Sequence, residues 1–141
     1  MRQTSVMAAF VVTVDCPLPP EVAWRRVTDW AAHGRFVPFT TVTPVTAPPG
    51  FVARTGLGRL GFDDPMEIVA WDPPRHCRVE KRGRVIRGWA ELTVVPRGAG
   101  SRVSWREEAV PAGLPRPARP VADAAGRWLF GRVLRGLLAD R

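Results

Sequence analysis

The chain consists largely of a series of short β-prone segments that ends in one long helical pattern. Six segments rich in β-branched and aromatic residues are separated by breaks that contain Gly and Pro. They span residues 41–46, 51–56, 60–71, 77–82, 85–95 and 102–110. Residues 119–140 then carry apolar side chains at helical spacing. Consecutive strands followed by one covering helix predict an α+β domain with an antiparallel sheet.

The N-terminal part adds a seventh strand and a helical segment. Residues 6–15 are rich in β-branched residues and end just before Pro17. From Glu21 to His33, apolar side chains recur at helical spacing, Pro20 suits a first helical turn, and Gly34 suits a helix end. We therefore expect seven strands, a short helical region after the first strand, and the long helix last.

The last two strands have one register that satisfies charge and apolarity together. A turn at residues 97–100 sets Glu91 opposite Arg106 on one face and Ala90 opposite Glu107 on the other. On the second face the side chains become smaller from Leu92 and Trp105 to Gly88 and Ala90. The pattern therefore predicts open space between the sheet and the terminal helix. The remaining predicted pairs are Thr93 with Ser104, Val94 with Val103, and Leu92 with Trp105.

The net charge of +8 comes almost wholly from arginine, because Lys81 is the single lysine. A nucleic-acid site gathers its basic residues on one face, whereas these arginines are scattered among acidic residues along the chain. We therefore expect no nucleic-acid partner. The sequence has no CxxC motif and no Cys/His cluster with zinc-ligand spacing, so we expect no metal and no cofactor.

Length and composition predict one ordinary globular domain over residues 1–141. The chain is 45% hydrophobic and 24% charged, which is typical of soluble folded proteins. The apolar run at residues 6–14 is too short to span a bilayer and lacks a typical cleavage site, so we expect no membrane insertion. Two cysteines without a secretion signal indicate the cytoplasm. The sequence leaves a monomer and a homodimer equally open.

Apolar and aromatic side chains supply the candidate walls of a ligand site. They serve either as ordinary core or as the lining of a pocket, and the sequence leaves both roles open. Three glycines of the terminal helix, at residues 126, 131 and 136, indicate tight packing on the sheet or contact with a ligand. The candidate ligand-contacting residues are Trp30, Phe36, Phe39, Phe62, Met66, Ile68, Gly88, Ala90, Leu92, Trp105 and Trp128.

Glu107 is the leading polar candidate, because it shares its predicted face with apolar residues. Desolvation there raises the pKa of a carboxyl group, although a position at the rim or beside an arginine is the alternative. Lys81 lies on the inward side of its strand, where burial favours amine chemistry, unless its ammonium group reaches solvent. His33 and His76 have no partner that indicates a catalytic dyad, and we expect both to be exposed.

Four local motifs, in order, resemble one superfamily. They are PLPPEVAW at residues 17–24, TDW at 28–30, WDPPR at 71–75 and GSRVSW at 100–105. These segments are similar to signatures of the SRPBCC superfamily, also called START-like or polyketide cyclase/dehydrase and lipid transport. The likeness covers nearly the whole chain. It implies the helix-grip fold, in which a curved seven-stranded antiparallel sheet wraps around a long C-terminal helix, with short helices after the first strand.

The resemblance implies a pocket between the sheet and the terminal helix that takes a hydrophobic small molecule. Superfamily members use such pockets for lipids, polyketides, hormones or aromatic precursors. Aromatase/cyclase members rely on arginine, hydroxyl and tyrosine groups, and this chain contains no tyrosine. Binding is therefore the leading expectation. One alternative is polyketide cyclase or dehydratase chemistry at Glu107 and Arg54, with Arg54 also contacting the ligand. The other is docking of the basic surface on an acidic partner.

Overall fold

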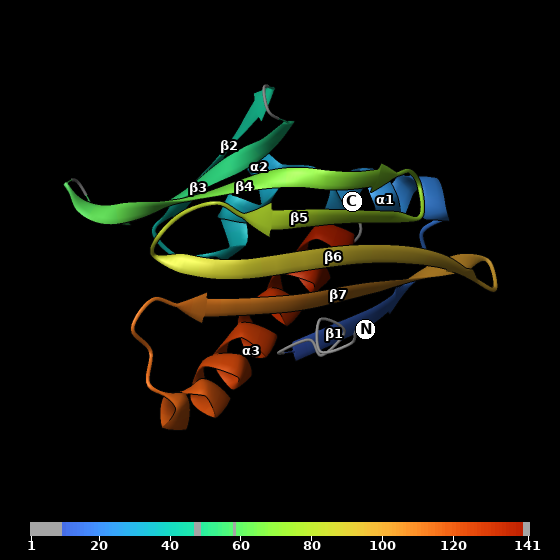
Figure 1. Cartoon of the computed structure of the whole chain (residues 1–141). Helices are drawn as coiled ribbons and strands as arrows, with labels where there is room; N and C mark the ends of the chain where they lie inside the picture. Colours follow the sequence, from blue (N-terminus) through green and yellow to red (C-terminus); the bar gives the residue numbers. More distant parts are fainter. Residues whose placement is uncertain (1–9, 47–48, 58, 140–141) are drawn as a thin grey trace.

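A seven-stranded antiparallel sheet forms one layer of the protein, and helices cover one of its faces (Figure 1). The computed structural model describes residues 10–46, 49–57 and 59–139. The strands are β1 (Phe10–Cys16), β2 (Thr40–Thr46), β3 (Pro49–Leu57), β4 (Leu60–Asp72), β5 (His76–Lys81), β6 (Ile86–Arg97) and β7 (Gly100–Pro111). The helices are α1 (Pro20–Val27), α2 (Trp30–His33), η2 (Gly34–Phe36), η3 (Arg116–Ala118) and α3 (Arg119–Leu138).

The strands follow one another around the sheet in the order β1-β7-β6-β5-β4-β3-β2. Strands β2 to β7 form a continuous meander, and β1 joins its end beside β7. The predicted α+β class with a seven-stranded antiparallel sheet is confirmed. Residues 6–9 of the predicted first strand and Asp140 of the predicted last helix lie outside the described residues.

The helical region from Glu21 to His33 is divided in two, in agreement with the short helices that the family resemblance implies. Helix α1 ends at Val27, and α2 begins at Trp30. Between them, the Thr28 hydroxyl donates to the carbonyl oxygen of Trp24 at 2.7 Å, and Asp29 adopts a non-helical backbone conformation. Thr and Asp commonly compete with helical hydrogen bonding in this way.

The predicted register of β6 and β7 is confirmed. Glu91 pairs with Arg106, Ala90 with Glu107, and the other predicted pairs are also present. Because alternate side chains point to opposite faces, this register fixes which residues of both strands face the helices.

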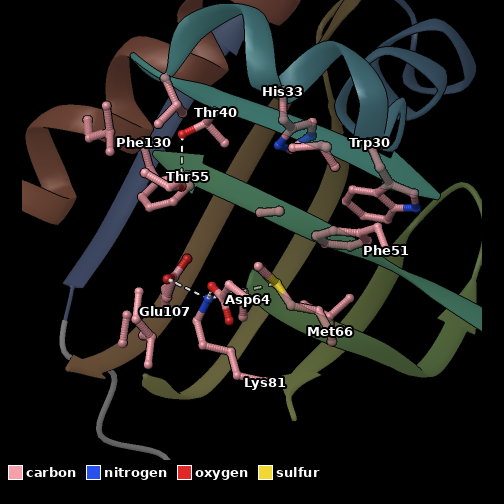
Figure 2. Close-up of a pocket in the computed structure, with 18 of the residues that line it drawn as sticks. Trp30, His33, Thr40, Phe51, Thr55, Asp64, Met66, Lys81, Glu107 and Phe130 are labelled. Carbon is pink, nitrogen blue, oxygen red and sulfur yellow. Dashed lines mark hydrogen bonds and ion pairs between the residues drawn. The ribbon is translucent and has the colours of Figure 1, made fainter. Parts of the chain in front are cut away.

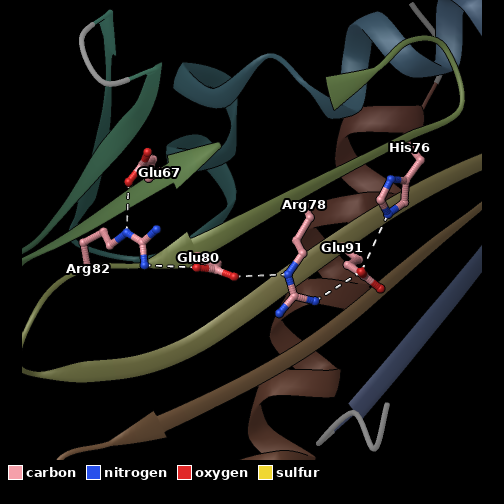
Figure 3. Close-up of polar contacts among 6 residues, drawn as sticks. All are labelled: Glu67, His76, Arg78, Glu80, Arg82 and Glu91. Carbon is pink, nitrogen blue, oxygen red and sulfur yellow. Dashed lines mark hydrogen bonds and ion pairs between the residues drawn. The ribbon is translucent and has the colours of Figure 1, made fainter. Parts of the chain in front are cut away.

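The outer face of the sheet carries a ladder of opposite charges (Figure 3). The Arg82 guanidinium lies 3.0 Å from both Glu67 and Glu80, and the Arg78 guanidinium lies 3.2 Å from Glu91. Surface ion pairs of this kind contribute little stability. The full ladder contains Glu67, His76, Arg78, Glu80, Arg82, Glu91 and Arg106.

The inner face packs against α1 and the C-terminal half of α3. Val27, Leu134 and Val103 are fully buried there. The buried residues of α3 begin at Gly131, and a Cβ atom at Gly136 would lie 2.3 Å from the ring of Phe36. Tight packing against aromatic rings therefore accounts for Gly136, and the same holds for Gly126 against Phe10. This end of the interior is solid.

Candidate functional site

The other end of the interior contains a cavity of about 290 Å³ between the inner face of the sheet, α2 and the middle of α3 (Figure 2). Strands β2 to β7 supply its floor, and Leu129 and Phe130 of α3 supply part of its wall. Most of the lining side chains are apolar. The buried residues of α3 begin at Gly131, just beyond the part of the helix that lines this space.

Strand alternation decides which side chains line the cavity. Phe51, Ala53 and Thr55 of β3 point inward, and so do alternate residues of the neighbouring strands. Two aromatic pairs stiffen the walls: the ring centroids of Trp30 and Phe51 lie 4.6 Å apart, and those of Trp105 and Phe130 lie 4.5 Å apart. Aromatic pairs at this spacing stabilise each other beyond their buried area.

The structure places seven of the predicted site residues in the cavity lining. They are Trp30, Phe62, Met66, Ala90, Leu92, Trp105 and Glu107. Ile68 is partly buried in the neighbouring core, and Phe36 packs against Gly136. Gly88 has a φ angle of +136°, and a Cβ there would overlap the Glu108 carbonyl, so its role is to allow close backbone approach.

Three predicted residues point away from the cavity, which corrects their expected placement. The Arg54 side chain is 44% exposed and lies 3.4 Å from Asp63, because it alternates with the inward residues of β3. Phe39 is 65% exposed at a position with positive φ. Trp128 is 63% exposed on the outer side of α3, with the Arg132 guanidinium over its ring.

A charged cluster of Asp64, Lys81 and Glu107 occupies one end of the cavity (Figure 2). The Lys81 ammonium lies 2.9 Å from Asp64 Oδ2 and 3.8 Å from Glu107 Oε2, and the Trp105 indole donates to Glu107 Oε1 at 2.7 Å. All three charged side chains are at most 8% exposed. Ala90, on the strand between Lys81 and Glu107, has a side chain small enough to leave room for this contact.

Burial controls the protonation of Glu107. Desolvation raises the pKa of this carboxyl group, and the opposing effects of the Lys81 charge and the Trp105 hydrogen bond are smaller. Burial therefore shifts Glu107 toward its neutral acid form, while its Oε2 lies 3.8 Å from the Lys81 ammonium. Glu107 lies in the cavity lining, on the face that its register with Ala90 predicts.

Asp64 has a buried oxygen atom without a partner. Oδ2 accepts from Lys81, whereas Oδ1 is the one buried polar side-chain atom, among the residues that the structure describes, that lacks a hydrogen bond. Buried acceptors are normally satisfied, because an unmet hydrogen bond is costly. The cavity beside Oδ1 is therefore the natural place for its donor.

His33 is buried, contrary to the exposure expected from its place at a helix end. Its Nε2 lies 2.8 Å from the Val27 carbonyl oxygen. The centroid of its ring lies 5.4 Å from the ring centroids of both Trp30 and Trp105. Nε2 therefore carries the proton that it donates to Val27. Desolvation lowers the pKa of His33, so the ring stays neutral at neutral pH. His76 is partly exposed on the outer face beside Glu91.

A comparison with protein-family models finds a match over residues 7–140 to the family described as polyketide cyclase/dehydrase and lipid transport. The chain belongs to this family. The match covers nearly its whole length, so the family resemblance predicted from the four motifs is confirmed. A search of curated proteins finds no match.

Solved structures confirm the helix-grip fold. TTHA0849 from Thermus thermophilus is 17% identical, with a TM-score of 0.71 over 91% of this chain and 94% of that one. XoxI from Bacillus cereus is 12% identical, with a TM-score of 0.72 over 94% of each chain. Mll3558 from Rhizobium loti is 16% identical, with a TM-score of 0.69 over 92% of this chain and 95% of that one. At these identities the likeness establishes the fold alone.

Sequence reasoning missed Asp64, although alternation contains the signal. Phe62 and Met66 were predicted to face the cavity, and Asp64 lies between them on the same face of β4. Among the described residues, no three His, Cys, Asp or Glu side chains are arranged to hold a metal ion. None of the described helices combines the length and apolarity required to cross a lipid bilayer.

Proposed function

We propose that this family member binds a hydrophobic small molecule, such as a lipid, a polyketide or an aromatic metabolite, in the cavity between the sheet and α3. The observation that carries the proposal is an apolar space of about 290 Å³ inside a domain whose other end is tightly packed. Ordinary protein interiors hold few voids larger than a water molecule. Small-molecule sites have volumes of roughly 300–1,000 Å³, so this cavity suits a ligand at the small end of that range.

The test is a titration with pyrene, a hydrocarbon whose emission spectrum reports the polarity around it. The wild-type protein should bind pyrene saturably, with one site per chain and an apolar emission spectrum. Val79 lies on the cavity floor, so Val79→Phe should place a ring inside the cavity and weaken binding about tenfold or more. Val95 lies on the exposed outer face, and Val95→Phe is the matched control that should leave affinity unchanged.

Two outcomes would contradict the binding proposal. One is the absence of saturable pyrene binding by the wild-type protein. The other is equal affinity in the wild type and Val79→Phe, because a ligand bound elsewhere does not sense the cavity floor.

The buried Asp64–Lys81–Glu107 cluster favours a second candidate, which is proton-transfer chemistry of the cyclase or dehydratase kind. Glu107 in its neutral form supplies an acid, and Asp64 Oδ1 supplies an unoccupied base within the same cavity. Arg54 is excluded from this role because its guanidinium lies outside the cavity, and Lys81 is the cation in its place.

Exchange of α-protons tests the second candidate. The bicyclic ketone 2-tetralone in D₂O should exchange its α-protons faster with the wild-type protein than with Glu107→Gln, as followed by ¹H NMR. Typical general acid or base contributions are about 10²–10⁴-fold in rate. Equal rates in both proteins would remove Glu107 from any catalytic role.

The same proposal assigns the chain one ligand-binding domain that works in the cytoplasm as a monomer or homodimer, without a nucleic-acid partner. Its support is the free state of Cys16 and Cys77, the family match along nearly the whole chain, and the balanced charges of the outer face. Sedimentation of the purified protein, with and without added RNA, tests the assembly state and the nucleic-acid expectation together.

A further inference from the structure

We propose that the ligand carries a neutral hydroxyl group on an apolar body, and that this hydroxyl donates to Asp64 Oδ1 while it accepts a hydrogen bond from Lys81. The inference rests on the proposed binding function and specifies the class of ligand. It makes Asp64 the residue that determines specificity at the polar end of the cavity.

The free oxygen of Asp64 is an acceptor that requires a hydrogen-bond donor on the ligand. Oδ1 is buried, has no hydrogen-bond partner among the described side chains, and belongs to a carboxylate that is 8% exposed. The other oxygen is already bound to Lys81 at 2.9 Å, which holds the carboxylate in place. A ligand group that donates a hydrogen bond therefore meets an acceptor that is already oriented.

The Lys81 ammonium is a donor that requires a hydrogen-bond acceptor on the ligand. Its ammonium group has three protons, and one is used by Asp64 Oδ2. The other nearby acceptors are weak or distant: the Met66 sulfur lies 3.7 Å away, and Glu107 Oε2 lies 3.8 Å away. An oxygen atom placed between Lys81 and Asp64 Oδ1 replaces these contacts with a normal hydrogen bond. A hydroxyl group both donates and accepts, so it satisfies both residues.

The balance of charge argues against ionic ligands. Asp64 and Lys81 neutralise each other at 2.9 Å, and Glu107 is only 2% exposed in an environment that favours its neutral form. A carboxylate on the ligand is repelled by the lone pairs of Asp64 Oδ1, and an ammonium on the ligand is repelled by the Lys81 charge. Either ion also loses its hydration in a cavity whose walls are mostly apolar.

The test compares ligands of one shape that differ in a single group, by displacement of bound pyrene. The compounds are 2-naphthol, naphthalene, 2-naphthoate and 2-naphthylmethylammonium. We expect 2-naphthol to bind wild-type protein about 10- to 100-fold more tightly than naphthalene, which is the range for a hydrogen bond to a charged group. We expect both ions to bind more weakly than 2-naphthol.

Three variants assign the preference to Asp64. Asp64→Asn should reduce the ratio of 2-naphthol affinity to naphthalene affinity at least tenfold. The double variant Asp64→Leu/Lys81→Met, which removes both charges together, should bring that ratio close to one even if Asp64→Asn folds poorly. Asp63→Asn is the matched control: Asp63 is the next residue, is 60% exposed, and should leave the ratio unchanged.

The outcomes separate this inference from the binding proposal. If pyrene does not bind wild-type protein, the binding proposal itself fails. If pyrene binds but 2-naphthol and naphthalene displace it equally well, or if either ion binds most tightly, the hydroxyl inference is overturned while the cavity remains a binding site. An unchanged affinity ratio in the double variant also overturns it, because the hydroxyl then bonds elsewhere.

Discussion

Replacing Lys81 by methionine should destabilise the protein severely. The Lys81 side chain is 4% exposed and lies 2.9 Å from Asp64 and 3.8 Å from Glu107. Lys81→Met keeps an unbranched chain of similar size but leaves the buried Asp64 carboxylate without its cation. Breaking a buried ion pair from one side costs about 3–5 kcal/mol. That loss is a large share of the roughly 5–15 kcal/mol that stabilises a typical domain.

The double variant Asp64→Leu/Lys81→Met should recover most of this loss. Replacing both members of a buried pair by apolar residues is often neutral or stabilising by about 1–4 kcal/mol. Arg82→Met is the matched control, because Arg82 is the next residue and its side chain is 47% exposed beside Glu67. A surface pair of this kind contributes about 0–1 kcal/mol, so Arg82→Met should change stability by no more than that.

Urea unfolding followed by far-ultraviolet circular dichroism measures the free energy of unfolding of all four proteins. A loss below about 1 kcal/mol in Lys81→Met would show that Asp64 is not left as a buried, unpaired charge, because such a charge costs more than that. A double variant that is no more stable than Lys81→Met would lead to the same conclusion.

Three further predictions concern the cavity, Glu107 and the helix glycines. Val79→Phe should lower stability by less than about 1 kcal/mol, because its ring enters empty space, whereas Val27→Phe in the packed core should cost about 1–3 kcal/mol; urea unfolding decides. The pKa of Glu107 is raised, so as pH rises above its ordinary value of 4.5 the unfolded chain loses this proton first and folding stability falls. Glu107→Gln lacks this contribution, so the melting temperature of the variant should increase relative to that of the wild type as pH rises. Melting temperatures that change with pH in the same way in both proteins would contradict the raised pKa. Gly136→Ala should lower the melting temperature because its Cβ meets the Phe36 ring at 2.3 Å, whereas Gly131→Ala, which meets the end of the Arg135 side chain at 3.1 Å, should raise it or leave it unchanged.

The sheet was predictable because its strands carry strong local signals. The turn at residues 97–100 and the facing charges of Glu91 and Arg106 allow one register for β6 and β7, and that register was confirmed. The helical region was less predictable. Thr28 and Asp29 interrupt the helix without interrupting its apolar periodicity, so periodicity alone does not locate the break, and the burial of His33 was not predicted.

The candidate site was predictable only where alternation was followed strictly. Glu107 was placed inward by its register with Ala90, and it does line the cavity. The chemistry of a guanidinium favours Arg54, but the inward positions of Phe51 and Ala53 require it to point outward. Alternation places Asp64 inward, between Phe62 and Met66.

The size of the cavity could not be predicted from local sequence patterns. It depends on where α3 meets the sheet, and that position is set by Leu134 and Leu138 packing into a core assembled from distant segments. Strand alternation therefore predicts which side chains face inward, but not how much space they leave.

Nuclear Overhauser effects between bound pyrene and the protein's methyl groups locate the ligand. A ligand inside the cavity gives contacts to the methyl groups of Val79 and Leu92, which line the cavity floor. Contacts confined to Val11 and Val95, which are exposed, would place the ligand outside the cavity and contradict the account.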